Sequence, residues 1–420
     1  MIVNILIFLI GLLIYAGYGW AGLAYLAGAT VLSYVLGLLI PKRRWLMWVG
    51  VALNTGVLLF IKLQPLTHLQ FISVLGISYF TLQIIAYLVD IYKGKQLPEK
   101  NFLRYALFVT YFPHLISGPI ERYDRFCSAL GDRRITFDGV LAGAVRAIWG
   151  GMKLLLIDAR VAVVIAAISA KPDSSSGAYA LAAMLLYSLR LYANFSGTMD
   201  VVLGLSQMLG LKLSENFDTP YLSQSFQEFW RRWHITLGDW LKNYIYIPLG
   251  GNRKGKIRKY LNLIVTFLVS GIWHGGEYLL WGVFNGIFVA FGTKLQTKWK
   301  HLNRIATFLL VSVLWSFGFV WGEPLTALKM IASLFTTFNY GAFFAGVGTL
   351  GLSMTDWIVV GVASIALWVY DVYKAQINPR IEALHPAAKT AVFCVLALIV
   401  LVFGRYGLGF DPAGSVYGGY

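Results

Sequence analysis

The sequence predicts an all-α, polytopic membrane protein. Apolar residues make up 58% of its 420 residues and charged residues only 13%, and the mean hydropathy is +0.67. A water-soluble domain of this length would have too few polar side chains to cover its surface. Apolar runs also recur from one end of the chain to the other, so we expect a single integral-membrane domain over residues 1–420.

The expected membrane helices follow the apolar runs in order. Several runs are shorter than the roughly 20 residues needed to cross a bilayer, so we expect about eleven true spans plus re-entrant or interfacial helices. The first run has no basic segment before it and no cleavage site after it, which predicts a retained helix. The runs cover residues 2–15, 23–40, 45–61, 71–89, 102–116, 140–156, 181–191, 261–273, 279–291, 305–320, 357–369 and 388–402.

The net charge of +16 comes from basic residues that cluster in short loops between the apolar runs. The positive-inside rule places such loops in the cytoplasm, where they orient the chain and attract anionic membrane lipids. We therefore expect no nucleic-acid partner. A second interpretation is that Arg253, Lys254 and Lys256 bind an anionic cytoplasmic donor. The clearest basic loops cover residues 41–44, 252–259 and 294–304.

The two cysteines, Cys127 and Cys394, lie far apart and have no metal-ligand spacing. This pattern argues against a zinc site, an iron–sulfur cluster and a disulfide framework. We expect no metal and no bound cofactor.

His274 is expected deep in the membrane, at the end of a broken span. It follows Tyr260, near the basic loop, by 14 positions, and at about 1.5 Å per residue this is about 21 Å of helix. Gly275 and Gly276 then permit a tight reversal, and the next apolar run returns toward the cytoplasm. A buried intramembrane histidine that lines a cavity is a candidate functional residue.

His234 lies in a second Trp-rich segment whose charged residues cannot face lipid. A lone intramembrane histidine commonly bonds a neighbouring helix, but here two of only six histidines occur in such segments. Pro248 and the Gly250–Gly251 pair are also expected to interrupt any helix at membrane depth. We therefore expect a polar tunnel through the bilayer, lined by Trp273, Arg231, Arg232, Asp239 and Asn243.

Several short motifs occur in a fixed order along most of the chain. They are Gly-Ile-Ser-Tyr-Phe-Thr-Leu-Gln at 76–83, Tyr-Leu-Val-Asp-Ile-Tyr-Lys-Gly at 87–94, Phe-Pro-His-Leu-Ile-Ser-Gly-Pro at 112–119, Asn-Phe-Ser-Gly at 194–197 with Asp200, Glu-Asn-Phe-Asp-Thr-Pro-Tyr at 215–221, Trp-Arg-Arg-Trp-His-Ile-Thr-Leu at 230–237, Tyr-Ile-Pro-Leu-Gly-Gly-Asn-Arg-Lys-Gly at 246–255 and Gly-Ile-Trp-His-Gly at 271–275. In this order they resemble the hallmark motifs of the bacterial membrane-bound O-acyltransferase (MBOAT) family, especially its alginate O-acetyltransferase branch.

The resemblance implies a ring of transmembrane helices around a thin centre, with funnels on both faces. It also implies that an acyl group passes from a cytoplasmic donor to an extracellular acceptor. The family's catalytic histidine corresponds to His274 and its second histidine to His234. Imidazole suits this task because acyl transfer to a hydroxyl needs a base that works near neutral pH. We expect His274 to be the general base and His234 to support or orient it.

The sequence departs from the alginate-type pattern at two places. Asn194 stands where those members usually carry Asp, and Thr198-Met199 stand where Tyr-Ser is common before Asp200. Recognition of the acceptor or of a partner is therefore expected to differ. The related branch that delivers D-alanine to teichoic acids generally lacks Tyr-Ile-Pro-Leu-Gly-Gly, which favours acetyl as the transferred group and leaves D-alanyl as the alternative.

The C-terminal tail contains a candidate acyl relay. By alternation of the spans the tail lies outside the cell, and it resembles a short Tyr-containing motif of some bacterial family members, in which the tyrosine hydroxyl is proposed to hold the acyl group. Tyr417 and Tyr420 fit this motif, whereas Ser415 replaces its aromatic residue. The alternative is a frayed terminus with interfacial tyrosines.

These features together predict an O-acyltransferase of the bacterial plasma membrane. The expected donor is acetyl-CoA or an acyl-carrier thioester, and the expected acceptor is an extracellular polysaccharide or cell-wall polymer. The resemblance adds a secreted or membrane-anchored, esterase-like partner protein. A transporter or lipid flippase is the non-enzymatic alternative, but such proteins usually show paired halves, and no internal repeat is evident in the sequence.

Overall fold

The fold is all-helical in a computed structural model that describes residues 2–67, 74–115, 117–170, 176–292, 296–319, 324–337 and 339–406. No β-strand occurs in these ranges, and one isolated antiparallel bridge joins Phe217 to Trp233. The α-helices are α1 (Ile2–Tyr18), α2 (Trp20–Leu39), α3 (Leu46–Thr67), α4 (Ile77–Tyr92), α5 (Phe102–Thr110), α6 (Phe112–Leu115), α7 (Tyr123–Gly131), α8 (Phe137–Met152), α9 (Ala159–Ser169), α10 (Gly177–Met208), α11 (Phe226–Arg232), α12 (Ile235–Leu241), α13 (Gly255–His274), α14 (Leu279–Phe291), α15 (Lys300–Leu314), α16 (Ser316–Phe319), α17 (Pro324–Thr336), α18 (Tyr340–Gly346), α19 (Met354–Glu382) and α20 (Pro386–Phe403). Short π- or 3₁₀-helical segments are η1 (Lys153–Asp158), η3 (Pro220–Leu222), η4 (Lys242–Tyr246), η5 (Gly276–Tyr278) and η7 (Val347–Thr349).

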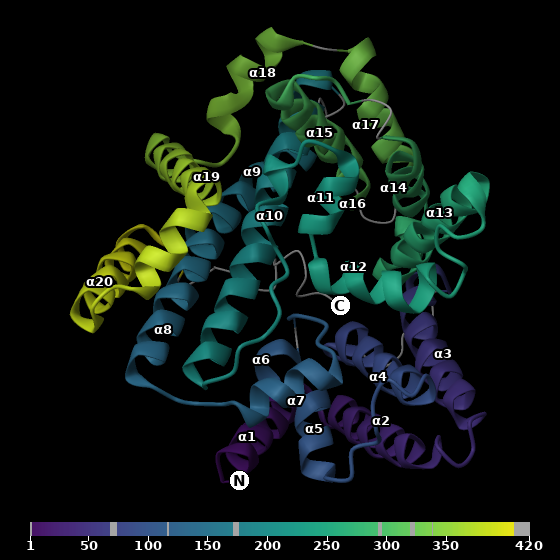
Figure 1. The fold of residues 1–420 in the computed structure, drawn as a ribbon. Coiled ribbons are helices and arrows are strands. Elements are labelled where there is room, and N and C mark those ends of the chain that lie inside the picture. Colours follow the sequence, from purple (N-terminus) through teal and green to yellow (C-terminus); the bar gives the residue numbers. More distant parts are fainter. Residues whose placement is uncertain are drawn as a thin grey trace.

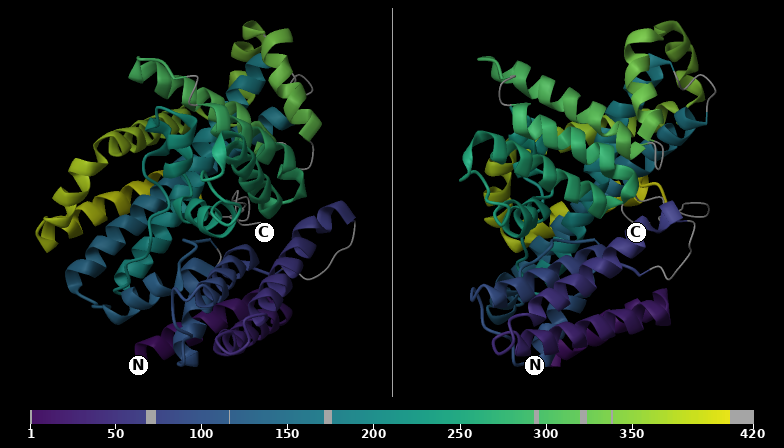
Figure 2. Two further views of the ribbon diagram at one scale, coloured as in Figure 1. Left: turned by 45° about the vertical axis from the view of Figure 1, so that its right-hand side comes forward. Right: turned by 90° about the vertical axis from the view of Figure 1, so that its right-hand side faces the viewer.

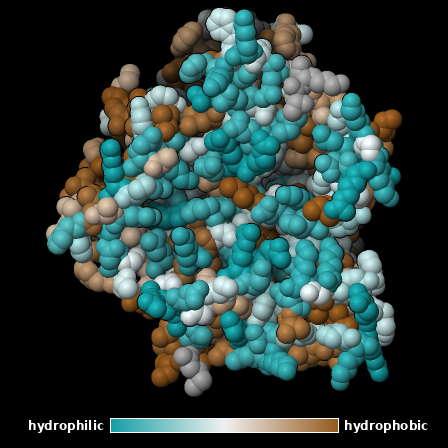
Figure 3. Space-filling model, in the orientation of Figure 1, coloured by the Kyte–Doolittle hydropathy of each residue, from teal (hydrophilic) through white to brown (hydrophobic). Residues whose placement is uncertain are grey.

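Several helices have the composition of membrane helices. Within the described ranges, α2, α3, α19 and α20 are long and apolar enough to cross a bilayer. Their apolar side chains point outward: Ile358, Val362 and Ile365 of α19 are each about 60% exposed. An outward apolar surface of this kind is stable against lipid. In Figure 3 brown apolar residues gather at the rim and hydrophilic residues spread over the face toward the viewer. The predicted class is therefore supported, and the number of about eleven spans stays a prediction.

The N-terminal helices α1–α7 gather on one side of the molecule and the later helices on the other (Figures 1 and 2). Buried aromatic rings hold the N-terminal group together. Tyr87 packs against Tyr105 with 4.6 Å between ring centroids and against Tyr123 with 5.0 Å. Gly37 of α2 faces the Tyr87 ring where a Cβ atom would come within 2.8 Å, so α2 can pack closely only without a side chain there.

Helices α8 and α10 form the closely packed centre of the second group. A Cβ atom at Gly150 would lie 2.4 Å from the carbonyl oxygen of Gly197, and one at Gly143 would lie 2.5 Å from that of Gly204. Small residues therefore let the two backbones touch, as is typical of membrane helices. The predicted run 181–191 belongs to this longer α10, and the run 140–156 continues from α8 into η1.

Candidate active site

The two predicted histidines line one cavity of about 400 Å³. The cavity lies among α10, α11, α12, α13, α14 and the α15–α16 region, so residues far apart in the sequence meet in it. Its walls combine aromatic rings with polar and cationic side chains that could orient a substrate. Besides His234 and His274, the lining includes Tyr187, Arg231, Trp230, Trp233, Lys242, Tyr246, Lys259, Tyr278, Trp281 and Trp315.

His234 is held in an unusual backbone conformation between two short helices. It precedes α12 with φ 46° and ψ 54°, a left-handed conformation that is uncommon for residues other than glycine. The ring is buried and meets Phe195 of α10 edge-on at 4.8 Å. Its Nδ1 lies 3.4 Å from Asn216 Oδ1, whereas its buried Nε2 has no hydrogen-bond partner within the described residues. A free ring nitrogen beside a cavity is available to a substrate.

His274 is the last residue of α13, and its position follows from a tight helix hairpin. Gly275 ends the helix with φ 146°, which confirms the predicted reversal. A Cβ atom at Gly282 would come within 2.6 Å of the Phe267 carbonyl oxygen, and one at Gly271 within 2.6 Å of the Tyr278 carbonyl oxygen. This close α13–α14 packing brings the half-buried His274 ring among aromatic neighbours, 4.6 Å from Trp273 and 5.5 Å from Trp281.

Trp230 supplies a second unpartnered polar atom to the cavity wall. Its Nε1 is buried and has no hydrogen-bond partner among the described residues, although the residue lines the cavity. An indole N–H can only donate. A buried donor without a partner costs free energy, so Trp230 Nε1 is a candidate contact for a substrate oxygen. Its place at the start of the Trp-Arg-Arg-Trp-His motif is the one sequence signal that points to it.

Of the predicted tunnel residues, only Arg231 lines the cavity. Arg232 turns away and forms an ion pair of 2.7 Å with Glu228, one helical turn earlier. Asp239 and Asn243 bond to each other, with Asn243 Nδ2 donating to the Asp239 carbonyl oxygen at 2.8 Å. Trp273 lies behind the wall, and its Nε1 donates to the Ser78 carbonyl oxygen.

The predicted donor-binding residues do not line this cavity, and their role stays a prediction. Arg253, Lys254 and Lys256 are all exposed, the first two just before α13 and Lys256 in its first turn. The exposed residues Lys242 and Lys259 line the cavity instead. The π-helical turn η4 places Lys242 there, and a sequence pattern does not reveal such a turn.

Two further predictions concern the tail and metals. Tyr417 lies outside the described residues, so its role as a relay stays a prediction. No group of three or more potential metal ligands occurs within the described part of the chain.

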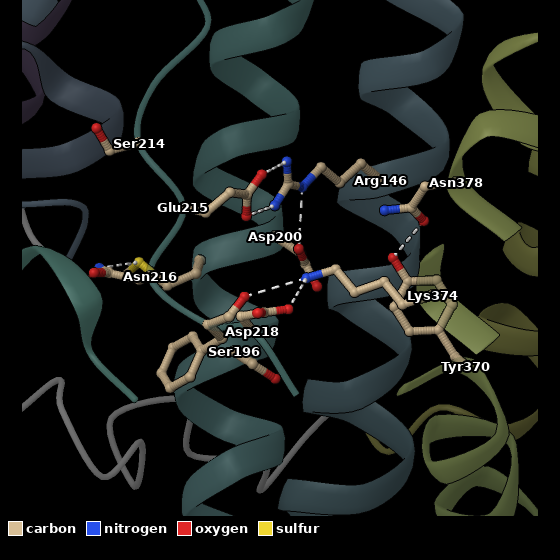
Figure 4. A network of polar contacts seen from close by, with 12 residues as sticks. Arg146, Ser196, Asp200, Ser214, Glu215, Asn216, Asp218, Tyr370, Lys374 and Asn378 are labelled. Atoms are coloured by element: carbon tan, nitrogen blue, oxygen red, sulfur yellow. Dashed lines mark hydrogen bonds and ion pairs between the residues drawn. The ribbon is translucent and has the colours of Figure 1, made fainter. Parts of the chain in front are cut away.

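A second cavity of about 440 Å³ lies among α8, α10, α19 and α20. Figure 4 shows the polar network beside it. Arg146 donates to Asp200 at 3.0 Å and to both carboxylate oxygens of Glu215 at 2.7 Å. Lys153, which is almost fully buried, donates to Asp200 at 2.7 Å. The buried charge of Lys153 is therefore paired, as burial requires, whereas Glu215 lies at the exposed end of the network.

The chain is similar in sequence to one protein family and to several named proteins. A family model described as MBOAT, membrane-bound O-acyltransferase family, matches residues 95–337. The probable alginate O-acetylase AlgI of Pseudomonas putida is 36% identical over 344 residues, which cover 74% of this chain and 70% of that protein. The peptidoglycan O-acetyltransferase of Helicobacter pylori is 33% identical over 355 residues, covering 73% and 66%. The teichoic acid D-alanyltransferase of Streptococcus thermophilus is 28% identical over 282 residues, covering 62% and 67%. The matched region thus spans about two thirds of the length of these relatives.

Proposed function

The chain belongs to the membrane-bound O-acyltransferase family and is an acyltransferase, and on this premise we propose that it moves an acetyl group from a cytoplasmic thioester to hydroxyls of an extracellular polysaccharide or cell-wall polymer. The observation that carries the proposal is that His234 and His274 line the same cavity. The cavity combines aromatic rings with polar and cationic side chains, which suits an acyl group attached to a charged donor.

His274 is the general base in this proposal. It removes the proton of the acceptor hydroxyl while that oxygen attacks the thioester carbonyl carbon, and the proton then passes to the leaving thiolate. The Trp230 indole N–H donates to the carbonyl oxygen as negative charge develops on it. His234 orients the reactants through its free Nε2.

The donor enters beside Lys242, Lys259 and Arg231, whose cationic groups attract the phosphates of acetyl-CoA or of a phosphopantetheine-linked carrier protein. The basic loop with Arg253, Lys254 and Lys256 adds a general attraction from outside the cavity. No metal takes part in these steps.

The wider architecture follows the same proposal. A single domain of about eleven spans forms a ring around a thin centre, with a funnel on each face. The chain lies in the bacterial plasma membrane with its C-terminus outside. The Tyr417 hydroxyl is the first acceptor that attacks the thioester, and a polymer hydroxyl then attacks the Tyr417 ester and releases the tyrosine hydroxyl. A secreted or membrane-anchored, esterase-like protein completes delivery.

Acetyl is favoured over D-alanyl by the relatives' names. The proteins named as O-acetylases or O-acetyltransferases are 33–36% identical to this chain, whereas the D-alanyltransferase of Streptococcus thermophilus is 28% identical. D-Alanyl transfer to teichoic acid remains the second candidate because all these proteins share the family.

Donor discrimination tests the proposal directly. Membranes that contain the protein are supplied with labelled acetyl-CoA or with a labelled D-alanyl carrier protein, and label is measured on the isolated polymer and on lipid. We expect acetyl label on the polymer only. D-Alanyl label on the polymer would establish the second candidate, and label on lipid alone would contradict a polymer acceptor.

A further inference from the structure

An extended segment between α10 and η3 separates the two cavities. Asn216 of this segment lines the second cavity, whereas His234 lines the first, and the residues that line the two cavities do not overlap. The contact between Asn216 and His234 therefore lies in the wall between them. Both residues are buried, with exposed fractions of 0% and 3%, so whatever orients the Asn216 amide also orients the ring.

The segment is fixed on both sides of Asn216. Glu215 is held by the two-pronged contact with Arg146, the strongest common geometry for a carboxylate (Figure 4). On the other side, Lys374 Nζ donates to the Phe217 carbonyl oxygen at 3.2 Å. Directly before Glu215, the Ser214 N–H donates to the Glu121 carboxylate. Contacts of Ser214, Glu215 and Phe217 thus fix the chain on both sides of Asn216.

The orientation of the Asn216 amide follows from its contacts with Thr236. Asn216 Oδ1 accepts a hydrogen bond from the Thr236 backbone N–H at 3.0 Å and from its hydroxyl at 2.7 Å. A backbone N–H can only donate, so the amide atom facing it must be the oxygen. The amide nitrogen then faces the Met199 sulfur at 3.2 Å, a weak acceptor.

This orientation determines where the His234 proton lies. Nδ1 is 3.4 Å from Asn216 Oδ1, at the long end of the hydrogen-bonding range, and an oxygen can only accept. A neutral ring that donates in this contact bears its proton on Nδ1 and its lone pair on Nε2. Nε2 is the buried atom without a partner among the described residues.

The backbone of His234 is held by the same residue. The Asn216 carbonyl oxygen accepts the Ile235 N–H at 3.0 Å, directly after the left-handed turn at His234. Within the described ranges only His234 and Thr219 have a positive φ without being glycine. A strained backbone persists only when its surroundings fix it, and such strain often occurs at functional sites.

We propose that Asn216 is a positioning residue for acyl transfer: it holds His234 in the tautomer protonated on Nδ1, so that Nε2 is presented to the substrates as a hydrogen-bond acceptor. This inference rests on the proposed function for its catalytic consequence. The tautomer itself does not depend on that function and is measured without any substrate.

The first test is the nitrogen-15 NMR spectrum of the full-length protein, labelled at histidine, in lipid bilayers near neutral pH. A protonated ring nitrogen and a bare one have well-separated chemical shifts, and the His234 signals are identified by their absence in His234→Gln. We expect a protonated Nδ1 and a bare Nε2 for His234. The opposite tautomer in the wild-type protein would overturn the proposal without any need for variants.

The second test compares two substitutions of similar size. Asn216→Leu removes the acceptor, and Asn216→Asp keeps it. In the leucine variant we expect loss of the Nδ1-protonated signature and a fall in kcat of about 10- to 100-fold, because a misplaced reacting group is costly, with little change in the donor KM. The aspartate variant should keep the signature and recover part of kcat.

The matched control is Asn54→Leu, since Asn54 is also buried but its amide donates to the Gly50 carbonyl oxygen of its own helix. It should leave the His234 signature and kcat unchanged. A leucine variant at position 216 that keeps both the signature and wild-type kcat would refute the positioning role. If the tautomer depends on Asn216 while the wild-type protein transfers no acyl group, the proposed function fails and the assignment of the proton stands. Should Asn216→Leu fail to accumulate in the membrane, the wild-type spectrum decides alone.

Discussion

The rings of His234 and Trp273 lie 6.2 Å apart, although His234 directly precedes α12 and Trp273 lies near the end of α13. Trp273 precedes His274 and donates its indole N–H to the Ser78 carbonyl oxygen at 3.2 Å. It thereby joins the segment of one histidine to that of the other and ties both to α4. A change at Trp273 should therefore disturb both histidines without touching the cavity directly.

Trp273→Ala should destabilise the protein by about 3–5 kcal/mol, because a buried indole is replaced by a void. Acyl transfer should fall with it, whereas Trp273→Phe should keep most of both. Thermal unfolding in detergent and polymer labelling are the measurements. Trp368→Ala serves as the control, since Trp368 is 59% exposed. Equal melting temperatures for Trp273→Ala and wild type would contradict the packing argument.

Trp230→Phe should lower kcat by about 10²–10³-fold, the usual effect of losing one donor to a developing oxyanion. The ring and its contact with Trp281, at 5.5 Å, are largely kept. Steady-state kinetics with acetyl-CoA should show this loss with a nearly unchanged donor KM. A raised KM with normal kcat would instead mean that the indole N–H contributes to ground-state binding.

Lys242→Ala combined with Lys259→Ala should raise the donor KM several-fold and weaken its dependence on salt, because both cationic residues line the cavity. The triple alanine variant of Arg253, Lys254 and Lys256 is the matched comparison and should change KM less. If the loop variant has the larger effect, donor binding occurs outside the cavity.

Gly282→Ala should prevent the close packing of α13 and α14, since its Cβ atom would lie 2.6 Å from a backbone oxygen. We expect a lower melting temperature and a displaced His274, with loss of transfer. Gly361→Ala in α19 is the control, because a Cβ atom there meets nothing within 4 Å. Wild-type stability in Gly282→Ala would show that the hairpin tolerates separation.

The sequence predicted the parts of the site that depend on local signals. The break at Gly275, the end of α13 at His274 and the meeting of two Trp-rich segments all follow from residue type and spacing. The ion pair between Arg232 and Glu228 could also have been predicted, because Glu228 lies four positions earlier on the same helix. Asn216 could have been suspected only from its place in the 215–221 motif, since its contact with His234 depends on long-range folding. Lys259 lines the cavity and Arg253 does not. This difference depends on which face of α13 turns inward, and the basic residues of the loop do not indicate that face.

The central claim is that His274 removes the acceptor proton. The most direct measurement is the rate of acetyl transfer from labelled acetyl-CoA to the polymer by His274→Ala in sealed vesicles, at equal amounts of membrane-inserted protein. We expect a fall of about 10²–10⁴-fold, the usual contribution of a general base. His301→Ala, which changes an exposed histidine at the start of α15, should transfer at the wild-type rate. A fully active His274→Ala protein would contradict the account.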